Sequence, residues 1–184
     1  MSEKFKIFDD NLPYFVTFTV VKWIDLFTRN EYRKVIINNL QYCQKNKGLI
    51  IYAYCIMTNH IHLILSSSDE SNLSNTIRDF RGFTSKTLLD VIKSNPRESR
   101  KKWLLKSFRF EGNKRKSNTT YQLWKRNFHP LELDNHYLIK EKIEYIHQNP
   151  VKAGFVFKAT DYVFSSASDY SGKQGLINVR NIFE

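Results

Sequence analysis

Residues 49–66 read LIIYAYCIMTNHIHLILS, and this stretch decides the fold. Two runs rich in aliphatic, β-branched and aromatic residues flank the polar pair Thr58–Asn59. Such runs predict strands, and the short polar connection predicts that the two strands pair as a hairpin. We therefore expect one strand over residues 49–57 and a second over residues 60–66.

The second strand of this hairpin carries two histidines, His60 and His62, on either side of one isoleucine. Side chains alternate across a strand, so both imidazoles should face the same side of the sheet. Two neighbouring imidazoles on a rigid surface can bind one divalent cation. A histidine on an apolar strand is nevertheless more often structural than a metal ligand, so this motif is a weak signal by itself.

The rest of the chain completes an alternating pattern of strands and helices. We predict further strands at 14–21, within 121–128 and near 176–179, and helices at 30–45, 73–92 and 97–108. A last helix should begin at an N-cap at Asp134 and extend to about Asn149, where Pro150 ends it. This order is the split βαβ pattern of a ferredoxin-like (RRM-like) α+β sandwich with an antiparallel sheet. The fold carries no function by itself, because it hosts many unrelated activities.

The length of 184 residues suits a single domain over residues 1–184, and we see one hydrophobic core. We expect the core of the domain at about 12–170, with a basic insertion at about 97–126. Cys43 and Cys55 lack CxxC spacing, so no disulfide framework is expected. The first residues lack an apolar signal core, and no apolar run reaches membrane-spanning length. We expect a cytoplasmic, nucleoid-associated protein.

The net charge of +11 favours a polyanionic partner, and most of it lies in one segment. Residues 97–126 hold eleven basic residues against two glutamates, interleaved with aromatic residues. Cations can contact phosphates and aromatic rings can stack on bases, a combination that suits single-stranded nucleic acid. The alternative is a solvated helix and loop whose aromatic residues belong to the core. The candidate DNA-binding residues are Arg97, Arg100, Lys101, Lys102, Lys106, Arg109, Lys114, Arg115, Lys116, Lys125, Arg126 and, beyond this segment, Lys152.

Residues 144–154 read EYIHQNPVKAG and hold the second candidate for chemistry. Tyr145 and Asn149 are four residues apart in the expected helix, so they share one face. A tyrosine can attack phosphorus as a phenolate, and an amide oxygen can ligate a hard metal ion. Each residue also has an ordinary interpretation: a helical tyrosine usually packs, and an asparagine before proline usually ends a helix.

Four segments together resemble one known family. They are residues 54–64 (YCIMTNHIHLI), 123–128 (LWKRNF), 145–154 (YIHQNPVKAG) and 165–170 (SSASDY). In this order and at these distances they resemble the single-tyrosine HUH transposases, and most closely the branch of REP-associated tyrosine transposases. The resemblance extends from about Tyr14 to Tyr170.

The resemblance implies a mechanism and a set of site residues. His60 and His62 would bind Mg²⁺ or Mn²⁺. Tyr145 would attack single-stranded DNA beside a hairpin, forming a 5′-phosphotyrosine and a free 3′-OH. Asn149 stands where the wider family often has a glutamine as third ligand; because asparagine is shorter, Gln148 or water could replace it. Residues 97–126 would cradle the hairpin, and a homodimer is possible.

Two other functions remain open at the level of sequence. The chain could be a non-catalytic nucleic-acid-binding module of RRM-like architecture, although such modules need aromatic residues at the centre of the sheet face. It could also be a metal-dependent hydrolase with water as nucleophile, which would keep its activity without Tyr145. We expect His129 to be a turn residue, and His136 and His147 to be structural or exposed.

Overall fold

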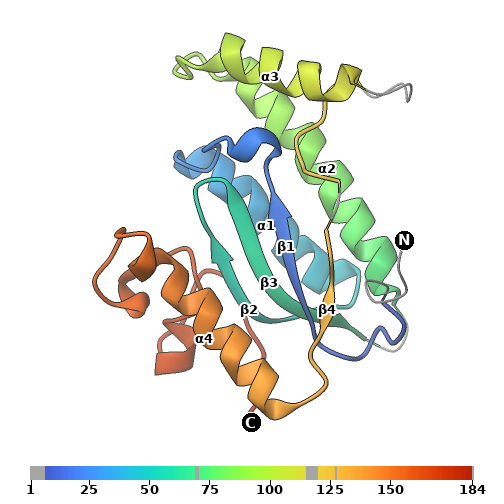
Figure 1. The fold of residues 1–184 in the computed structure, drawn as a ribbon, viewed down its shortest axis with the longest axis vertical. Coiled ribbons are helices and arrows are strands. Elements are labelled where there is room, and N and C mark those ends of the chain that lie inside the picture. Colours follow the sequence, from blue (N-terminus) through green and yellow to red (C-terminus); the bar gives the residue numbers. More distant parts are fainter. Residues whose placement is uncertain (1–6, 69–70, 115–119, 127, 184) are drawn as a thin grey trace.

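The computed structural model describes residues 7–68, 71–114, 120–126 and 128–183, and Figure 1 shows how they are arranged. Strands β1 (Tyr14–Thr19), β2 (Leu49–Ile56) and β3 (His60–Ser67) form a sheet with the short β4 (Leu131–Glu132). The order across the sheet is β2-β3-β1-β4, and every neighbouring pair is antiparallel. Because β3 lies between β1 and β2, this is the split βαβ sandwich expected from the sequence, and the α+β fold class is confirmed.

Helices cover both faces of the sheet (Figure 1). Helices α1 (Asn30–Asn46) and α2 (Leu73–Ser94) lie behind it in this view, and α4 (His136–Lys152) crosses in front of β2 and β3. Helix α3 (Lys101–Asn113) lies across one end of α2, away from α4. None of the helices in the described part of the chain is long and apolar enough to span a membrane.

The alternation of side chains along β1 separates two environments. Tyr14, Val16 and Phe18 are buried on the side of α1 and α2, whereas Phe15 and Thr17 are half-buried on the side of α4. A second buried cluster lies on this other side, made of Tyr52, Ala53, Cys55, Met57, Ile64, Leu133, Ile139, Ile143, Ile146 and Tyr162. The expectation of one hydrophobic core is therefore wrong. The nearly continuous apolar sequence of β2 is the physical reason, since a strand of that kind is buried on both faces.

Helix α4 begins and ends differently from the sequence-based expectation. Its N-cap is Asn135, whose side chain accepts a hydrogen bond from the backbone nitrogen of Leu138, so the expected cap at Asp134 is wrong by one residue. Pro150 lies inside the helix, which continues to Lys152. A proline costs only one backbone hydrogen bond in a last turn, and its fixed φ is compatible with a helix. The chain turns away at Gly154, where φ is +74°.

The second half of the sheet differs more from the prediction. The fourth strand lies at Leu131–Glu132 rather than within residues 121–128, where Trp124 forms only an isolated bridge with Val20. Residues 176–179 form no strand, although Ile177 is buried and packs in the core. Residues 123 and 125 still form backbone hydrogen bonds with Val21 and Thr19, but this pairing does not extend into a strand.

A buried carboxylate, Glu98, ties the start of α3 to α1. Its oxygens accept hydrogen bonds from Arg29 Nε (3.0 Å), Arg100 Nε (3.1 Å) and the Tyr32 hydroxyl (2.9 Å). Burial by itself raises the pKa of Glu98, but the hydrogen bonds from Arg100 and Tyr32 outweigh it and lower the pKa to about 2. The carboxylate is therefore charged at neutral pH, and it fixes two guanidinium groups.

We expect Glu98→Gln to lower the free energy of unfolding by about 3 kcal/mol at pH 7, because it leaves two arginines without their buried counter-charge. The folded-state pKa is depressed, so this stabilisation is complete above the ordinary value of 4.5 and is lost as the pH falls toward 2. Urea unfolding at pH 7 and pH 3 measures the difference between the variant and the wild type. The exposed control is Glu144→Gln. This account of Glu98 would be contradicted if the difference in free energy of unfolding between Glu98→Gln and the wild type were the same at both pH values, or if Glu98→Gln lost no more stability than the control.

Candidate active site

His60 and His62 lie on the central strand β3, on the face that α4 covers. Their partners across β1 are Thr19 and Thr17. The two imidazole rings are 4.6 Å apart between centroids, and their planes are nearly perpendicular at 74°. The expectation that the two side chains share one face is confirmed.

Asn59 fixes the orientation of the first imidazole. Its amide nitrogen donates to Asp25 Oδ1 (3.0 Å) and to the Trp23 carbonyl (3.4 Å), so its amide oxygen faces His60. That oxygen lies 2.6 Å from His60 Nδ1 and accepts its proton. A neutral imidazole with the proton on Nδ1 keeps its lone pair on Nε2. His60 is therefore prepared to act as a ligand through Nε2.

His62 is more deeply enclosed, with 4% of its surface exposed. Its Nδ1 lies 2.8 Å from the hydroxyl of Thr17, and its buried Nε2 has no hydrogen-bond partner among the described residues. Burial lowers the pKa of His62 to about 3, with a further lowering by His60 and a partial offset by the side chain of Asn149. The ring is thus neutral at pH 7, and Nε2 forms no hydrogen bond of ordinary geometry with the described residues, although the side chain of Asn149 interacts with the ring.

Helix α4 brings Tyr145 onto this pair. The Tyr145 and His62 rings are 5.3 Å apart between centroids. Phe15 contacts both, stacked on His62 at 5.5 Å and edge-on to Tyr145 at 5.9 Å. Tyr145 is 41% exposed, so a phenol beside a buried imidazole remains accessible from solvent.

Asn149 lies one turn after Tyr145 on the same face of α4. Its amide nitrogen donates to the Tyr145 carbonyl at 2.7 Å, which leaves its oxygen available. The contact with His62 that partly offsets the lowered pKa involves Asn149, not Gln148. The described residues contain no group of three His, Cys, Asp or Glu side chains suited to a metal. A cation here would thus have two imidazoles, with amide, water or phosphate oxygens completing its coordination.

His147 holds α4 in place from the opposite side of the helix. It is buried, and its Nε2 lies 2.9 Å from the hydroxyl of Ser166. Ser166 also accepts from the backbone nitrogen of Tyr54 in β2 (2.9 Å). Burial lowers the pKa of His147 to about 4, so the ring is neutral. The expected structural role of His147 is confirmed, and His136 at the start of α4 is exposed, as expected.

The candidate DNA-binding residues fall into different settings. Arg100 is bonded to Glu98 and to the Asp25 carbonyl, and so is committed to the fold. Lys101 donates to the Lys93 carbonyl, and Lys114 pairs with Glu111. The exposed members are Arg97, Lys102, Lys106, Arg109, Arg126 and Lys152, while Arg115 and Lys116 lie outside the described residues.

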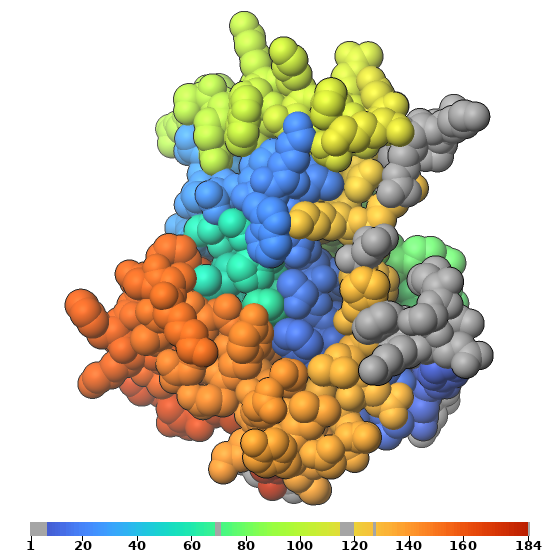
Figure 2. Space-filling view, in the orientation of Figure 1, coloured from blue at the N-terminus to red at the C-terminus, as the bar shows by residue number. Residues whose placement is uncertain are grey.

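Helices α3 and α4 are both visible on one face of the molecule (Figure 2). In Figure 2, α3 (yellow-green) lies at the top of this face, above the blue segment that follows β1, and α4 (orange) lies at the bottom. Strand residues, coloured blue and teal, are visible in the hollowed region between them. The remaining candidate, Lys125, is half-buried and lies over the ring of Trp23, with Nζ 4.1 Å from its centroid.

Sequence reasoning did not identify the residues that orient the pair: Thr17, Asn59, Phe15 and Trp23. Thr17 could have been found, because it lies on the same face of its strand as the half-buried Phe15 and is polar. Asn59 immediately precedes the histidine motif, but its bonds to Asp25 and Trp23 depend on a loop that is distant in sequence.

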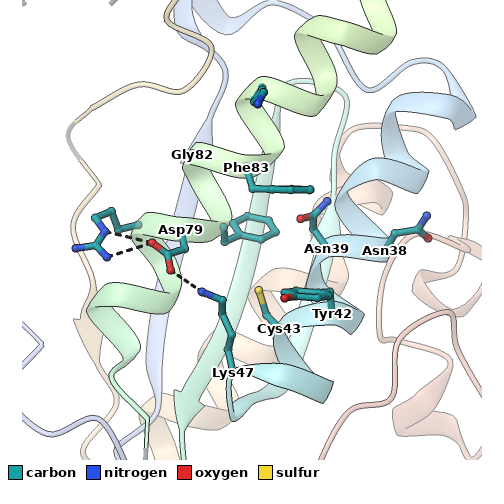
Figure 3. Close-up of a pocket in the computed structure, with 11 residues that line it drawn as sticks. Asn38, Asn39, Tyr42, Cys43, Lys47, Asp79, Gly82 and Phe83 are labelled. Carbon is teal, nitrogen blue, oxygen red and sulfur yellow. Dashed lines mark hydrogen bonds and ion pairs between the residues drawn. The ribbon is translucent and has the colours of Figure 1, made fainter.

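A groove of about 860 Å³ lies on the opposite side of the sheet, between α1 and α2 (Figure 3). Lys47 and Asp79 pair with each other at its edge. Burial raises the pKa of the Cys43 thiol, which therefore stays protonated. Its lining residues thus offer no activated nucleophile, and we assign the candidate chemistry to the histidine face.

Comparison with known proteins agrees with this geometry. A family model described as IS200-like transposase matches residues 10–149, which include both histidines, Tyr145 and Asn149. The chain belongs to the IS200-like transposase family. The expected resemblance to the tyrosine transposases is confirmed.

Solved structures extend the comparison to the whole fold. A REP-associated tyrosine transposase bound to a REP hairpin has a TM-score of 0.66 at 16% identity, covering 100% of this chain and 94% of that one. A transposase-like protein from Deinococcus radiodurans has a TM-score of 0.44 at 16% identity, covering 78% and 96%. Curated proteins gave no match.

We expect Ser166→Ala to destabilise the protein by about 1–3 kcal/mol, because it leaves His147 and the backbone of Tyr54 without their buried partner. Thermal and urea unfolding measure this loss. Ser168→Ala, at a half-buried neighbouring position, is the matched control. Equal stability of the two variants would show that the Ser166 contacts do not hold α4.

Proposed function

We propose that this transposase cleaves and rejoins single-stranded DNA next to hairpins, through a covalent 5′-phosphotyrosine on Tyr145. The observation that carries the proposal is the position of an exposed phenol beside two neighbouring imidazoles, of which His62 is buried and His60 half-buried. A phenol and a cation site on one face suit an attack on a phosphodiester, whose negative charge the cation would offset.

The residues present fit a divalent cation, Mg²⁺ or Mn²⁺. His62 Nε2 is buried and unpaired, and hydrogen bonds at Nδ1 leave Nε2 of both rings as the coordinating atoms. Asn149 would supply an amide oxygen. Imidazole is a better ligand for Mn²⁺ than for Mg²⁺, which prefers oxygen, so Mn²⁺ suits this donor set better. When bound, the metal would polarise the phosphodiester and help the 3′-oxygen to leave.

The covalent step depends on the chain's own phenol. The Tyr145 oxygen would form a bond to phosphorus as the bond from phosphorus to the 3′-oxygen breaks. The phenol loses its proton, and the departing oxygen takes one up as a free 3′-OH. The phosphotyrosine retains the energy of the phosphodiester, so a second 3′-OH can reverse the step without an external energy source.

The hairpin partner is supported by two observations. Helix α3 carries the exposed basic residues Lys102, Lys106 and Arg109, and it lies on the face of the molecule that α4 also borders. The structurally similar REP-associated transposase is described as bound to a REP hairpin. We infer that α3 contacts the phosphates of a hairpin while the unpaired strand enters the hollow.

A non-catalytic RRM-like module fits less well. Such modules present a sheet face on which bases stack. Here α4 covers much of that face through Ile139, Ile143 and Ile146. The part that remains carries histidines in a neutral, ligand-ready form, which base stacking does not require.

Covalent trapping tests the proposal. Incubation with hairpin-bearing single-stranded DNA and Mn²⁺, followed by a denaturing gel, should show an adduct for the wild type and none for Tyr145→Phe. Tyr137→Phe is the matched control, because Tyr137 is an exposed tyrosine on the same helix. Hydrolysis that persists in Tyr145→Phe would instead indicate water as the nucleophile, and the absence of any adduct across varied hairpins would refute the proposal.

Removing the hydroxyl that orients His62 should weaken metal binding. We expect Thr17→Val to lower Mn²⁺ affinity about 10- to 100-fold, as loss of an outer hydrogen bond commonly does. Calorimetric titration of the folded variant measures this. Thr19→Val, two residues away on the same face of β1, should bind as the wild type does. Equal affinities for the two variants would mean that Thr17 does not prepare the ligand.

A further inference from the structure

Trp23 is exposed beside His60, in a position that needs an explanation. Its indole is 56% exposed, and its ring centroid lies 5.9 Å from that of His60 in an edge-on contact. An apolar ring that is mostly exposed contributes little to the stability of the free protein, because little of its surface is removed from water. It is well placed to receive a flat apolar ligand.

The backbone that carries Trp23 is strained. Lys22 and Trp23 have φ of 56° and 55°, and they are the only non-glycine residues with positive φ in the described parts of the chain. Side chains other than glycine pay an energetic cost in this region, and such strain persists only where the surroundings impose it. Here the Trp23 carbonyl accepts from Asn59, and the backbone nitrogen of Val21 donates to Leu123 (2.8 Å).

The same amide that orients His60 therefore also holds the strained turn. Asn59 contacts His60 Nδ1 through its oxygen and the Trp23 carbonyl through its nitrogen. The backbone of Trp23 is thus tied to the residue that orients the imidazole, and the two rings are in edge-on contact. A ligand on Trp23 would be held at a defined place next to the histidine pair.

Lys125 adds a cation to this platform. Its Nζ lies 4.1 Å from the Trp23 ring centroid, and its backbone nitrogen donates to the Thr19 carbonyl (2.7 Å). An aromatic ring next to a lysine can stack a base while the ammonium contacts the adjoining phosphate. This pairing does not by itself distinguish one base from another, since every base has a flat face.

We propose that Trp23 and Lys125 form a binding subsite for one unpaired nucleotide of single-stranded DNA, next to the phosphate that Tyr145 attacks. The choice of phosphate rests on the proposed function, whereas the stacking of a base on Trp23 does not. Trp23 would position the strand through base stacking, and Lys125 would hold a neighbouring phosphate.

The binding test uses an unstructured oligothymidylate of about eight nucleotides. Measurements in a Tyr145→Phe background exclude covalent capture. We expect Trp23→Leu to weaken binding about 10- to 100-fold, and Trp23→Phe to retain most of the affinity. Phe157→Leu, at a fully exposed aromatic residue, is the matched control and should bind normally.

Fluorescence provides a readout that does not depend on the folding of a Trp23 variant. In Trp103→Phe the remaining tryptophans are the exposed Trp23 and the buried Trp124. Stacking of thymine on Trp23 should quench the exposed component. Unchanged fluorescence at saturating oligonucleotide, or Trp23→Phe losing affinity as severely as Trp23→Leu, would overturn the subsite.

The two proposals can fail separately. Quenching and the affinity difference without any covalent adduct in the wild type would support the Trp23 subsite while refuting transesterification by Tyr145. An adduct on Tyr145 with unchanged affinity in Trp23→Leu would refute the subsite alone.

Discussion

The packing of α4 against the sheet is the interaction on which the candidate site depends. Tyr145 reaches the histidines only because Ile139, Ile143 and Ile146 bury their side chains over β2 and β3. Burial of three such residues contributes roughly 5–9 kcal/mol by area considerations, an upper estimate because unfolded chains also bury surface. Apolar contacts have no preferred direction, whereas the hydrogen bond between His147 and Ser166 does, and it therefore helps to fix the orientation of α4.

The site combines two environments that are usually separate. His62 is enclosed and neutral, whereas Tyr145 is substantially exposed. Because His62 is buried and neutral, its lone pair is available to a cation. Because Tyr145 is exposed, its hydroxyl is accessible to a polymer as large as DNA. Asn59 and Thr17 complete this arrangement, because each fixes one imidazole through its Nδ1. The half-buried ring of Phe15 contacts both His62 and Tyr145.

The sequence predicted the parts of the molecule that follow local patterns. Periodicity and turn residues predicted the hairpin, the two helices behind the sheet and the shared face of the histidines. The structure confirms all three. The continuation of α4 through Pro150 and the position of β4 did not follow, because tertiary packing decides both. Arg100 is the clearest case: its charge suggested DNA, but a buried glutamate two residues earlier binds its guanidinium. The strain at Lys22 and Trp23 left no signal in the sequence, since neither residue favours a left-handed backbone.

Mass spectrometry of the trapped protein would test the central claim most directly. After nuclease and trypsin digestion, the account predicts a nucleotide joined through its 5′-phosphate to Tyr145, within the peptide of residues 143–152. A nucleotide attached to another tyrosine, such as Tyr137, would contradict it, because that hydroxyl does not lie beside the imidazole pair.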